Sequence, residues 1–431
     1  MLLTAFCPIV TVAQQQAQIK VKQYAVMPGW AKNSVNTVVF RKDPITTYKN
    51  TQYIAFYDAE ANVVLGKRNL GAKKWETKIT QYKGKATDAH NSISIMTDGK
   101  GFLHISWDHH GNALRYARSV KPGSLELQEK TPMTGSLEGN LTYPQFFKLP
   151  DGNLLFLYRD GSSGSGNVVL NYYNTATQQW TQRHRTLIDG NGQRNAYCQM
   201  DVDKKGTIQL SWVWRERAEV ETNHDLCYAR SRDGGITWEK TSGEKYVLPI
   251  TAATAEYALK IPEKSELINQ TSITADDQGN PYIATYWRQQ GSKIPQYRVV
   301  YHNGEQWAMQ QVSQRTMPFT LSGGGTKKIP ISRPQIMVLN RKGQQMVVIV
   351  FRDEERNNKV SIALCKELQK GVWETHDLTQ EPVGQWEPAF DTELWKSKGL
   401  LNLFLQKVEQ ADGEGIAQVK PEMISVLEWK P

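Results

Sequence analysis

The sequence contains few cysteines and few long apolar runs, and both absences exclude classes of protein. Four cysteines occur in 431 residues, and Cys7 falls in an apolar leader, which leaves Cys198, Cys227 and Cys365. Because three is an odd number, a framework built only from disulfides is not expected. Beyond the leader, no stretch of the sequence is long and apolar enough to cross a bilayer, so no membrane span is expected.

Runs of basic residues are also missing, although the chain carries a positive net charge. Lys and Arg number 52 against 43 Asp and Glu, which gives a net charge of +9. A basic balance suits a polyanionic partner such as nucleic acid, anionic lipid or an acidic polysaccharide. Because the basic residues are dispersed, the sequence has no nucleic-acid-binding tail and no nucleic-acid partner is expected. The 13 Trp and 18 Tyr suit a sugar-binding cleft or, alternatively, the interior of a β-fold.

Residues 1–13 have the pattern of a secretory signal peptide. MLLTAFCPIVTVA is apolar and ends in small residues, and the polar stretch QQQAQ follows. This pattern predicts cleavage near Ala13 and a secreted or periplasmic protein, although the usual basic residues at the start are missing. Residues 18–431 are expected to form a single domain and to remain a monomer.

Helical periodicity is scarce, and the best helical candidate is the short segment Thr251–Leu259. Elsewhere, short alternating strands are separated by Asp-Gly, Asn-Gly and Lys-Gly turns. A layout of short strands recurs seven times, in the segments 53–80, 90–129, 143–183, 199–240, 271–311, 334–376 and 388–427. Such units predict an all-β fold, a seven-bladed β-propeller of four-stranded antiparallel blades, although the loose spacing leaves six or eight blades open. The segment 19–40 is expected to supply the outer strand that closes the ring with the last blade.

One local motif supports the propeller. Ser231–Trp238, SRDGGITW, matches the Asp-box pattern S-x-D-x-G-x-T-W. In this motif the Ser and Asp side chains bind the backbone of a turn, and the Trp packs beneath it. The motif is therefore interpreted as a structural turn without a catalytic role.

Four groups that can transfer protons or bind an anion fall at strand ends between residues 88 and 159. His90 precedes ISIM, His110 follows FLHISW, Tyr143 precedes FFKL and Arg159 follows LLFLY. Strand middles build cores, whereas strand ends and the loops beyond them carry functional sites. Taken singly, such a Tyr is more often a packed aromatic, and such an Arg more often pairs with a nearby carboxylate, here Asp160.

Several of these segments together resemble a known family. The Asp box, DAHNSISI, GFLHISWDHHGNALRYARS, YPQF and LYRDGSSGSG are similar to the secreted propeller family that includes the ulvan lyases. The resemblance covers nearly the whole mature chain and implies a site at one face of a seven-bladed propeller. It also implies cleavage of rhamnosyl-glucuronate linkages by β-elimination. By this resemblance His90, His110, Tyr143 and Arg159 are the catalytic residues, and the Asp-x-His-x-Asn pattern favours His110 over His109.

β-Elimination on a uronate requires groups of these kinds. A base must take the proton at C5, and an acid must reach the leaving oxygen. A cation at the carboxylate stabilises the negative charge that grows there in the transition state. Arg159 suits this role because its planar fork binds a carboxylate through two hydrogen bonds. Tyr143 and His90 can divide the base and acid roles, and His110 would orient a partner or bind the carboxylate; no catalytic cofactor is needed.

Polar residues at corresponding positions of later units are candidates for substrate binding. They precede the first strand or end the second strand in units four, five and six, and they are Arg194, Tyr197, Asn269, Gln270, Arg288 and Arg333. If the blades align these positions, the side chains would converge at one end of the central channel. Alternatively, the arginines only tie neighbouring blades together.

His184, Cys198, His224 and Cys227 form a candidate metal site. His224-x-x-Cys227 has the spacing of a ligand pair, and two Cys with two His suit tetrahedral zinc. The resemblance also implies such a site, so a structural zinc ion with four protein ligands is expected. The alternatives are a Cys198–Cys227 disulfide, which a secreted compartment allows, or two unrelated buried thiols.

The sequence therefore predicts a polysaccharide lyase whose partner is an anionic, ulvan-like polysaccharide. Two alternatives remain. One is a propeller glycoside hydrolase that releases rhamnose from rhamnosyl-glucuronate, a reaction that usually needs two flanking carboxylates. The other is a carbohydrate-binding propeller without catalytic activity.

Overall fold

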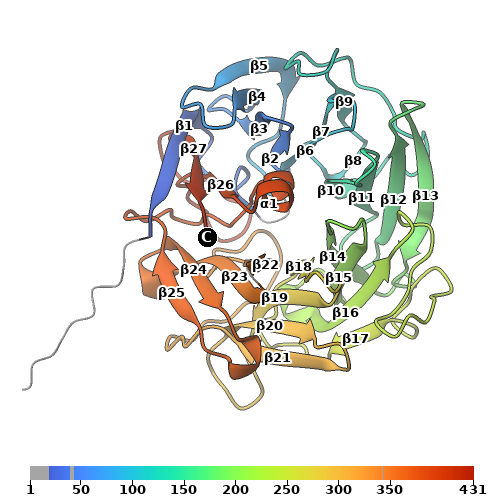
Figure 1. The fold of residues 1–431 in the computed structure, drawn as a ribbon, viewed down its shortest axis with the longest axis vertical. Helices are drawn as coiled ribbons and strands as arrows, with labels where there is room; N and C mark the ends of the chain where they lie inside the picture. Colours follow the sequence, from blue (N-terminus) through green and yellow to red (C-terminus); the bar gives the residue numbers. More distant parts are fainter. Residues whose placement is uncertain (1–18, 39–42, 342) are drawn as a thin grey trace, which may run out of the picture.

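A computed structural model describes residues 19–38, 43–341 and 343–431 of the chain. Within these ranges, seven antiparallel sheets surround a central axis, as Figure 1 shows. The predicted seven-bladed β-propeller is therefore confirmed. The predicted signal peptide, residues 1–13, lies outside the described residues. No helix in the described ranges has the length and apolar character needed to span a membrane.

Four blades each consist of four strands that follow one another from the channel outward. Blade one contains β2 (Ile45–Tyr48), β3 (Thr51–Tyr57), β4 (Asn62–Asn69) and β5 (Glu76–Lys83). Blade four contains β14 (Asn195–Val202), β15 (Ile208–Arg215), β16 (Asn223–Ser231) and β17 (Glu256–Leu259). Blade five contains β18 (Ser272–Ala275), β19 (Pro281–Trp287), β20 (Gln296–His302) and β21 (Trp307–Gln311). Blade six contains β22 (Gln335–Arg341), β23 (Gln344–Asp353), β24 (Lys359–Cys365) and β25 (Glu374–Asp377).

The other three blades depart from this layout. Blade two contains β6 (Ile93–Thr97), β7 (Leu103–Trp107) and β9 (Tyr116–Arg118). Blade three contains β10 (Leu141–Lys148), β11 (Leu154–Asp160), β12 (Asn167–Asn174) and β13 (Gln179–Ile188), and β8 (His110–Asn112) adds a fifth strand. Blade seven contains β26 (Leu401–Leu405), β27 (Glu422–Trp429) and β1 (Val21–Gly29). The described helices are α1 (Thr392–Lys398) and the 3-10 turns η1 (Val220–Thr222), η2 (Glu354–Arg356) and η3 (Leu368–Lys370).

The two ends of the described chain meet in blade seven. β1 pairs antiparallel with β27, from Val21 opposite Trp429 to Gly29 opposite Glu422. The prediction that the first segment closes the ring is therefore confirmed. Because the first and last strands share a sheet, the ring of blades is held closed by a ladder of backbone hydrogen bonds.

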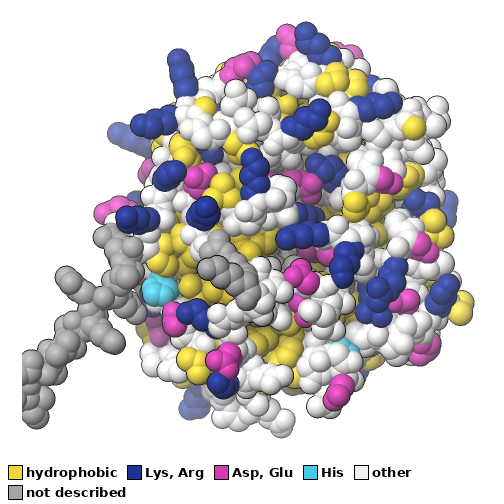
Figure 2. All heavy atoms as spheres, viewed as in Figure 1, with side chains coloured by type: hydrophobic (Ala, Val, Ile, Leu, Met, Phe, Trp, Pro, Cys, Tyr) yellow, Lys and Arg dark blue, Asp and Glu magenta, His cyan; other side chains and the backbone are white. Residues whose placement is uncertain are grey.

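The hydrophobic core lies between neighbouring blades. Strands β10, β11, β14 and β15 bury alternating apolar side chains, and Leu155, Met200, Leu210 and Trp212 lie in one cluster between blades three and four. Each such side chain contributes about 1.5–3 kcal/mol on burial. This packing fixes the ends of the inner strands relative to one another. Figure 2 shows that Lys and Arg side chains on the viewed face are spread out and mixed with acidic ones.

The Asp box in blade four forms the structural turn that its sequence predicts. Asp233 Oδ1 accepts hydrogen bonds from Ser231 Oγ at 2.8 Å and from the backbone of Ile236 and Thr237. The Trp238 indole is buried and donates to the Gly235 carbonyl at 3.2 Å. The Ser and Asp side chains of the motif are thus used within the turn.

The helix predicted at Thr251–Leu259 is wrong. The first part of that segment makes a single hydrogen-bonded turn, and the rest forms β17, which pairs with β16 at the edge of blade four. Pairing with an existing strand satisfies the backbone where an isolated short helix would be marginal. The helix of the structure, α1, lies instead in a segment interpreted as strand, because Asp391 caps its first turn and Gly399 ends it with a positive φ of 59°.

Asp391 also joins blade seven to blade one. Its side chain is fully buried and accepts hydrogen bonds from Thr47 Oγ1 at 2.5 Å, Gln52 Nε2 at 2.9 Å and the Leu394 amide at 2.9 Å. Gln52 in turn accepts from the buried guanidinium of Arg68 at 2.7 Å. One carboxylate therefore caps α1 and links the two blades at the ring closure.

Replacing Asp391 with Ala should lower the free energy of unfolding by about 2–4 kcal/mol, because the cap is lost and buried donors are left without acceptors. Asp391→Asn is the matched control and should cost less, since its amide oxygen can still cap α1. Denaturant titration followed by tryptophan fluorescence measures both. Equal stability of the Ala variant and the wild type would show that this network does not hold the ring closed.

Candidate active site

The four predicted catalytic residues lie together at one end of the inner strands. The rings of His90 and His110 stack with centroids 4.0 Å apart, and the rings of His90 and Tyr143 are 6.1 Å apart. The Arg159 guanidinium lies 5.1 Å from the centre of the Tyr143 ring. Residues from blades two and three, separated by up to 69 positions in sequence, thus form one cluster.

Asp88, which the sequence analysis did not select, holds the histidine pair. Its Oδ1 lies 2.9 Å from His90 Nδ1, and its Oδ2 lies 2.8 Å from His110 Nδ1. Burial alone would raise the pKa of Asp88, but the hydrogen bonds from His110 and His90 hold it well below its usual range. An ionised Asp88 accepts an N–H from each ring, so both histidines present Nε2 away from it.

The remaining histidines of this region are structural. His109 is fully buried, its Nε2 accepts the Arg115 amide at 3.0 Å, and burial lowers its pKa to about 3. His104 is buried between Tyr116, at 2.7 Å, and Asp98, at 3.3 Å. The structure therefore places His110 in the cluster, whereas His104 and His109 lie outside it.

Tyr143 is presented by an irregularity at the start of β10. Pairing between β10 and β11 shifts register between Thr142 and Gln145, and Tyr143 has a φ of 56°. A positive φ is uncommon for an aromatic residue and is often retained at functional sites. Burial raises the pKa of the Tyr143 hydroxyl, so the phenol is protonated near neutral pH.

Tyr197 lies between two buried arginines. Its hydroxyl accepts hydrogen bonds from Arg159 Nη1 and Arg215 Nη1, both at 3.3 Å, and contacts Ser163 Oγ at 2.9 Å. Burial alone would raise the pKa of Tyr197, but the charges of Arg215 and Arg159 lower it overall. A cavity of about 20 Å³ lies among Tyr143, Arg159 and Tyr197, which is room for one water-sized group.

Neither arginine is neutralised within the described part of the chain. Arg159 and Arg215 are each 7% exposed, and no ion pair joins either to a carboxylate of the described residues. Arg159 Nε is buried and has no hydrogen-bond partner there. The predicted alternative, pairing of Arg159 with Asp160, is not among the ion pairs of the structure. Two buried positive charges therefore meet at the Tyr197 hydroxyl, beside Tyr143, without a carboxylate counterion among the described residues.

Arg215 was missed by the sequence analysis although a signal for it exists. An Arg stands within one residue of the end of the second strand in four successive blades, at Arg159, Arg215, Arg288 and Arg352. Only Arg159 and Arg288 were selected. Comparing the repeats position by position would have added Arg215.

The predicted substrate-binding residues divide into two groups. Tyr197 and Gln270 line the small cavity beside Tyr143, and Asn269 bonds Gln270 at 3.4 Å. The arginines instead pair with carboxylates, and the pairs are Arg194 with Glu216 at 2.9 Å, Arg288 with Glu266 at 2.6 Å and Arg333 with Glu387 at 2.8 Å. The Arg194–Glu216 and Arg288–Glu266 pairs each lie at the end of a single blade, whereas Arg333–Glu387 joins the segments that lead into blades six and seven, as the alternative expects. The charge of Arg333 also acts to lower the pKa of Tyr143.

The four predicted zinc ligands are not gathered in the described structure. His184 bonds the Gly235 carbonyl at 2.6 Å, and His224 lies between Glu216 at 2.7 Å and Asp225 at 3.2 Å. Cys198 and Cys227 are free, buried thiols.

Strand register explains why the thiols stay apart. Cys198 in β14 and Cys227 in β16 both lie opposite Trp212 in β15, so two strand spacings of about 5 Å separate them. This separation exceeds the reach of a disulfide, about 7 Å between Cα atoms. These residues therefore do not fit a tetrahedral zinc ion.

Among the described residues, one group has several potential metal ligands close together. Atoms of Asp88, His90 and His110 lie within 4.8 Å of one another. Asp88 already forms hydrogen bonds with both histidines. The arrangement can therefore orient the two imidazoles as well as it could bind a metal ion.

Asp88→Asn should lower the pKa of His90. Burial depresses this pKa, and the hydrogen bond and charge of Asp88 oppose that effect, so removing them leaves only the weaker opposing charge of Glu414 among the named carboxylates. NMR titration of the imidazole signals measures the change. Glu414→Gln is the matched control, because that carboxylate is 3.6 Å from His90 Nδ1 and half exposed, and it should have less effect. An unchanged pKa in Asp88→Asn would contradict the arrangement.

Comparison with known proteins supports the resemblance seen in the sequence. "Ulvan lyase, long isoform" of Alteromonas sp is 24% identical over 333 residues, which cover 60% of this chain and 33% of that protein. "Ulvan Lyase-PL25" of Pseudoalteromonas sp. (strain PLSV) is 23% identical over 369 residues, which cover 76% of this chain and 69% of that protein. The chain thus matches only a third of the long isoforms.

Solved structures share the fold. The crystal structure of polysaccharide lyase Uly1 superposes with a TM-score of 0.68 at 16% identity, covering 96% of this chain and 100% of that one. A PL25 ulvan lyase bound to -[GlcA(1-4)Rha3S]- gives a TM-score of 0.68 at 14% identity, covering 94% and 95%. The sequence profile of the BNR repeat-containing family matches residues 51–315, more than half of the sequence, and the chain therefore belongs to that family.

Proposed function

We propose that this protein is a polysaccharide lyase that cleaves a uronate-containing, ulvan-like polysaccharide by β-elimination. The relatives named ulvan lyase and the shared propeller fold support this activity. The ulvan fragment bound to a structural neighbour indicates the class of substrate. The observation that carries the proposal is the pair of buried arginines, Arg159 and Arg215, beside Tyr143.

The arginine pair supports an anionic substrate on energetic grounds. Arg215 is held by the carbonyls of Arg217 and Ala218, but neither arginine has a carboxylate partner among the described residues. Because buried charges without a counterion are costly, such a site favours a ligand that brings negative charge. A uronate carboxylate near Arg159 would gain charge compensation from the guanidinium, whose Nε has no hydrogen-bond partner among the described residues. Arg215 would add a second positive charge through the Tyr197 hydroxyl that both arginines bind.

His90 and Tyr143 would divide the proton transfers. Burial lowers the pKa of His90, which favours a neutral imidazole able to accept the C5 proton. Burial raises the pKa of Tyr143, which favours a phenol able to donate. As His90 takes the proton, the C5–H electron pair forms the C4–C5 double bond, the C4–O bond breaks, and Tyr143 protonates the departing oxygen. Asp88 would keep His90 and His110 oriented.

The cellular location is part of the same proposal. The apolar leader at residues 1–13 supports export, and a polymeric substrate would have to be met outside the cytoplasm. We propose that the leader is cleaved near Ala13 and that residues 18–431 form a monomeric propeller domain that is secreted or periplasmic. Mass spectrometry of the protein recovered from culture medium or periplasm tests the cleavage near Ala13.

The activity has a direct assay. Incubation with ulvan should raise the ultraviolet absorbance of an unsaturated uronate at the new chain ends. Release of free rhamnose without that absorbance would instead indicate a hydrolase, and binding without either product would indicate a carbohydrate-binding propeller. Tyr143→Phe is the control, because it keeps the ring and the packing but removes the hydroxyl proton, and it should abolish the absorbance change.

Arg159→Lys should lower kcat about a hundredfold and change KM less, because one preorganised, bidentate charge contact to the transition state is lost. The melting temperature should change little, since no carboxylate of the described chain pairs with Arg159. Arg288→Lys is the matched control: Arg288 directly follows the equivalent strand but pairs with Glu266, so stability should respond and kcat should not. Near-normal kcat with reduced stability in Arg159→Lys would make Arg159 a structural residue.

A further inference from the structure

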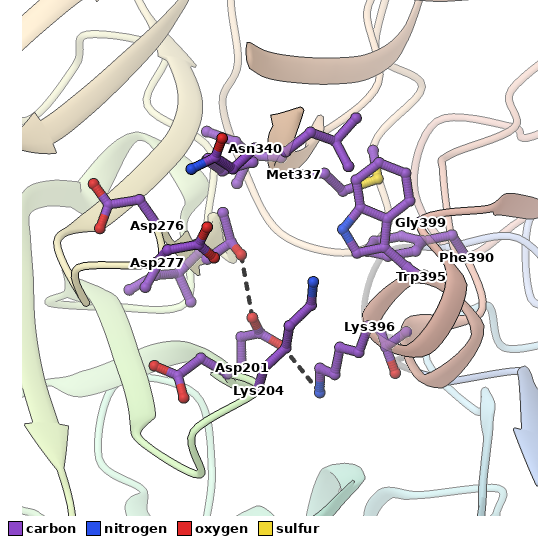
Figure 3. Close-up of a pocket in the computed structure, with 18 of the residues that line it drawn as sticks. Asp201, Lys204, Asp276, Asp277, Met337, Asn340, Phe390, Trp395, Lys396 and Gly399 are labelled. Atoms are coloured by element: carbon purple, nitrogen blue, oxygen red, sulfur yellow. Dashed lines mark hydrogen bonds and ion pairs between the residues drawn. The ribbon is translucent and has the colours of Figure 1, made fainter. Parts of the chain in front are cut away.

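A second cavity lies at the other end of the inner strands, beside α1 (Figure 3). Tyr143 lies near the start of β10, and Lys148 at the other end of that strand binds Glu393 of α1 at 2.9 Å. The cavity is therefore on the face opposite to the candidate active site. It encloses about 340 Å³ between α1 and blades four, five and six, within the range of about 300–1,000 Å³ that small-molecule sites occupy.

One wall of the cavity is apolar and aromatic. Trp395 of α1, Phe390 and Met337 form it, and Figure 3 shows their side chains together on one side. Trp395 packs in the core between blades six and seven and remains 8% exposed, so the ring is held in a fixed position. A rigid aromatic surface of this kind can cover the apolar face of a ligand ring.

The floor carries charges that neutralise one another. Lys396 Nζ lies 3.5 Å from both Asp201 and Glu393, and Asp201 also accepts a hydrogen bond from Thr274 at 3.3 Å. The dashed lines in Figure 3 mark the contacts of Asp201. These partners fix the side chains and leave little net charge at the bottom of the cavity.

Two exposed side chains at the rim have no partner. Lys204, in the turn after β14, and Asp277, in the turn after β18, form no hydrogen bond or ion pair through their side chains within the described ranges. In Figure 3, Lys204 extends into the cavity on the side facing Trp395, and Asp277 lies on the side of blade five. Four lysines and four aspartates line the whole cavity, so the charges of its lining balance.

We propose that this cavity binds a neutral pyranose sugar. A sugar hydroxyl both donates and accepts a hydrogen bond, so it can satisfy a lysine and an aspartate at once. The apolar face of the ring would lie against Trp395, as in sites that combine an apolar wall with a few polar groups. A ligand with a net charge of either sign would gain attraction from one set of side chains and repulsion from the other.

The site would bind polysaccharide on the face opposite to the candidate active site. If the candidate active site also binds the polymer, the two sites on one molecule would raise the local concentration of chain at each. The sugar-binding assignment itself does not depend on the lyase proposal, because it rests on a different cavity and different residues.

Saturation-transfer NMR and calorimetry with methyl α-rhamnopyranoside and methyl α-glucopyranoside test the assignment, with sodium glucuronate and free lysine as charged probes. The neutral glycosides should bind saturably, and more tightly than either charged probe. Lys204→Ala combined with Asp277→Ala should weaken that binding about tenfold or more, because the hydrogen bonds from two charged side chains to the sugar ring are lost. Glu60→Ala with Lys73→Ala, two exposed residues of blade one, is the matched control and should bind like the wild type.

The melting temperature of both double variants should equal that of the wild type, and both should still act on short uronate oligosaccharides as the wild type does. Absence of saturable binding by either neutral glycoside would overturn the assignment, as would binding that the Lys204/Asp277 variant retains. Tighter binding of a charged probe would overturn the neutral-ring assignment. Failure of the ultraviolet assay would not affect any of these outcomes.

Discussion

The candidate active site depends on two guanidinium groups that are buried around one phenol. Arg159 and Arg215 each donate to the Tyr197 hydroxyl at 3.3 Å, and in the described structure neither has a carboxylate partner. Like charges held this close in a protein interior repel each other and are poorly solvated. The arrangement is stable only because the surrounding fold determines it, and a bound carboxylate would relieve it.

The repeated blades of the propeller hold the two arginines in place. Each arginine lies at or next to the end of a second strand, and each second strand pairs with the inner strand of its blade. The packed core between blades three and four then sets one arginine against the other. The ring is closed by β1 on β27 and by the Asp391 contacts between blades seven and one, so the relative position of every blade is fixed. The positive φ of Tyr143 is a local strain that this rigid frame can support.

The sequence predicted the features that recur from blade to blade. It did not predict features set by a local cap or by pairing between strands. Alternating strands and turns predicted the blades, and strand ends placed His90, Tyr143 and Arg159 in one region. No helix forms at Thr251–Leu259 because strand pairing overrode the local pattern there. The helix α1 was missed because its cap, Asp391, lay in a segment interpreted as a strand. The zinc prediction used spacing along the chain, which could not show that Trp212 separates Cys198 from Cys227. Asp88 and Arg215 could have been found from the sequence. Asp88 lies in the same DAHN segment as His90, and Arg215 matches the Arg near the end of the second strand in other blades.

The central claim is that the buried arginines act on a substrate carboxylate. The most direct measurement compares the initial rate of chain cleavage on ulvan with the rate on ulvan whose uronate carboxyls have been reduced to alcohols. The account predicts that the wild-type protein cleaves the native polymer and fails to cleave the reduced one, because neither charge compensation nor acidification of C5 remains. Equal rates on the two polymers would contradict it and would assign the arginines to the scaffold alone.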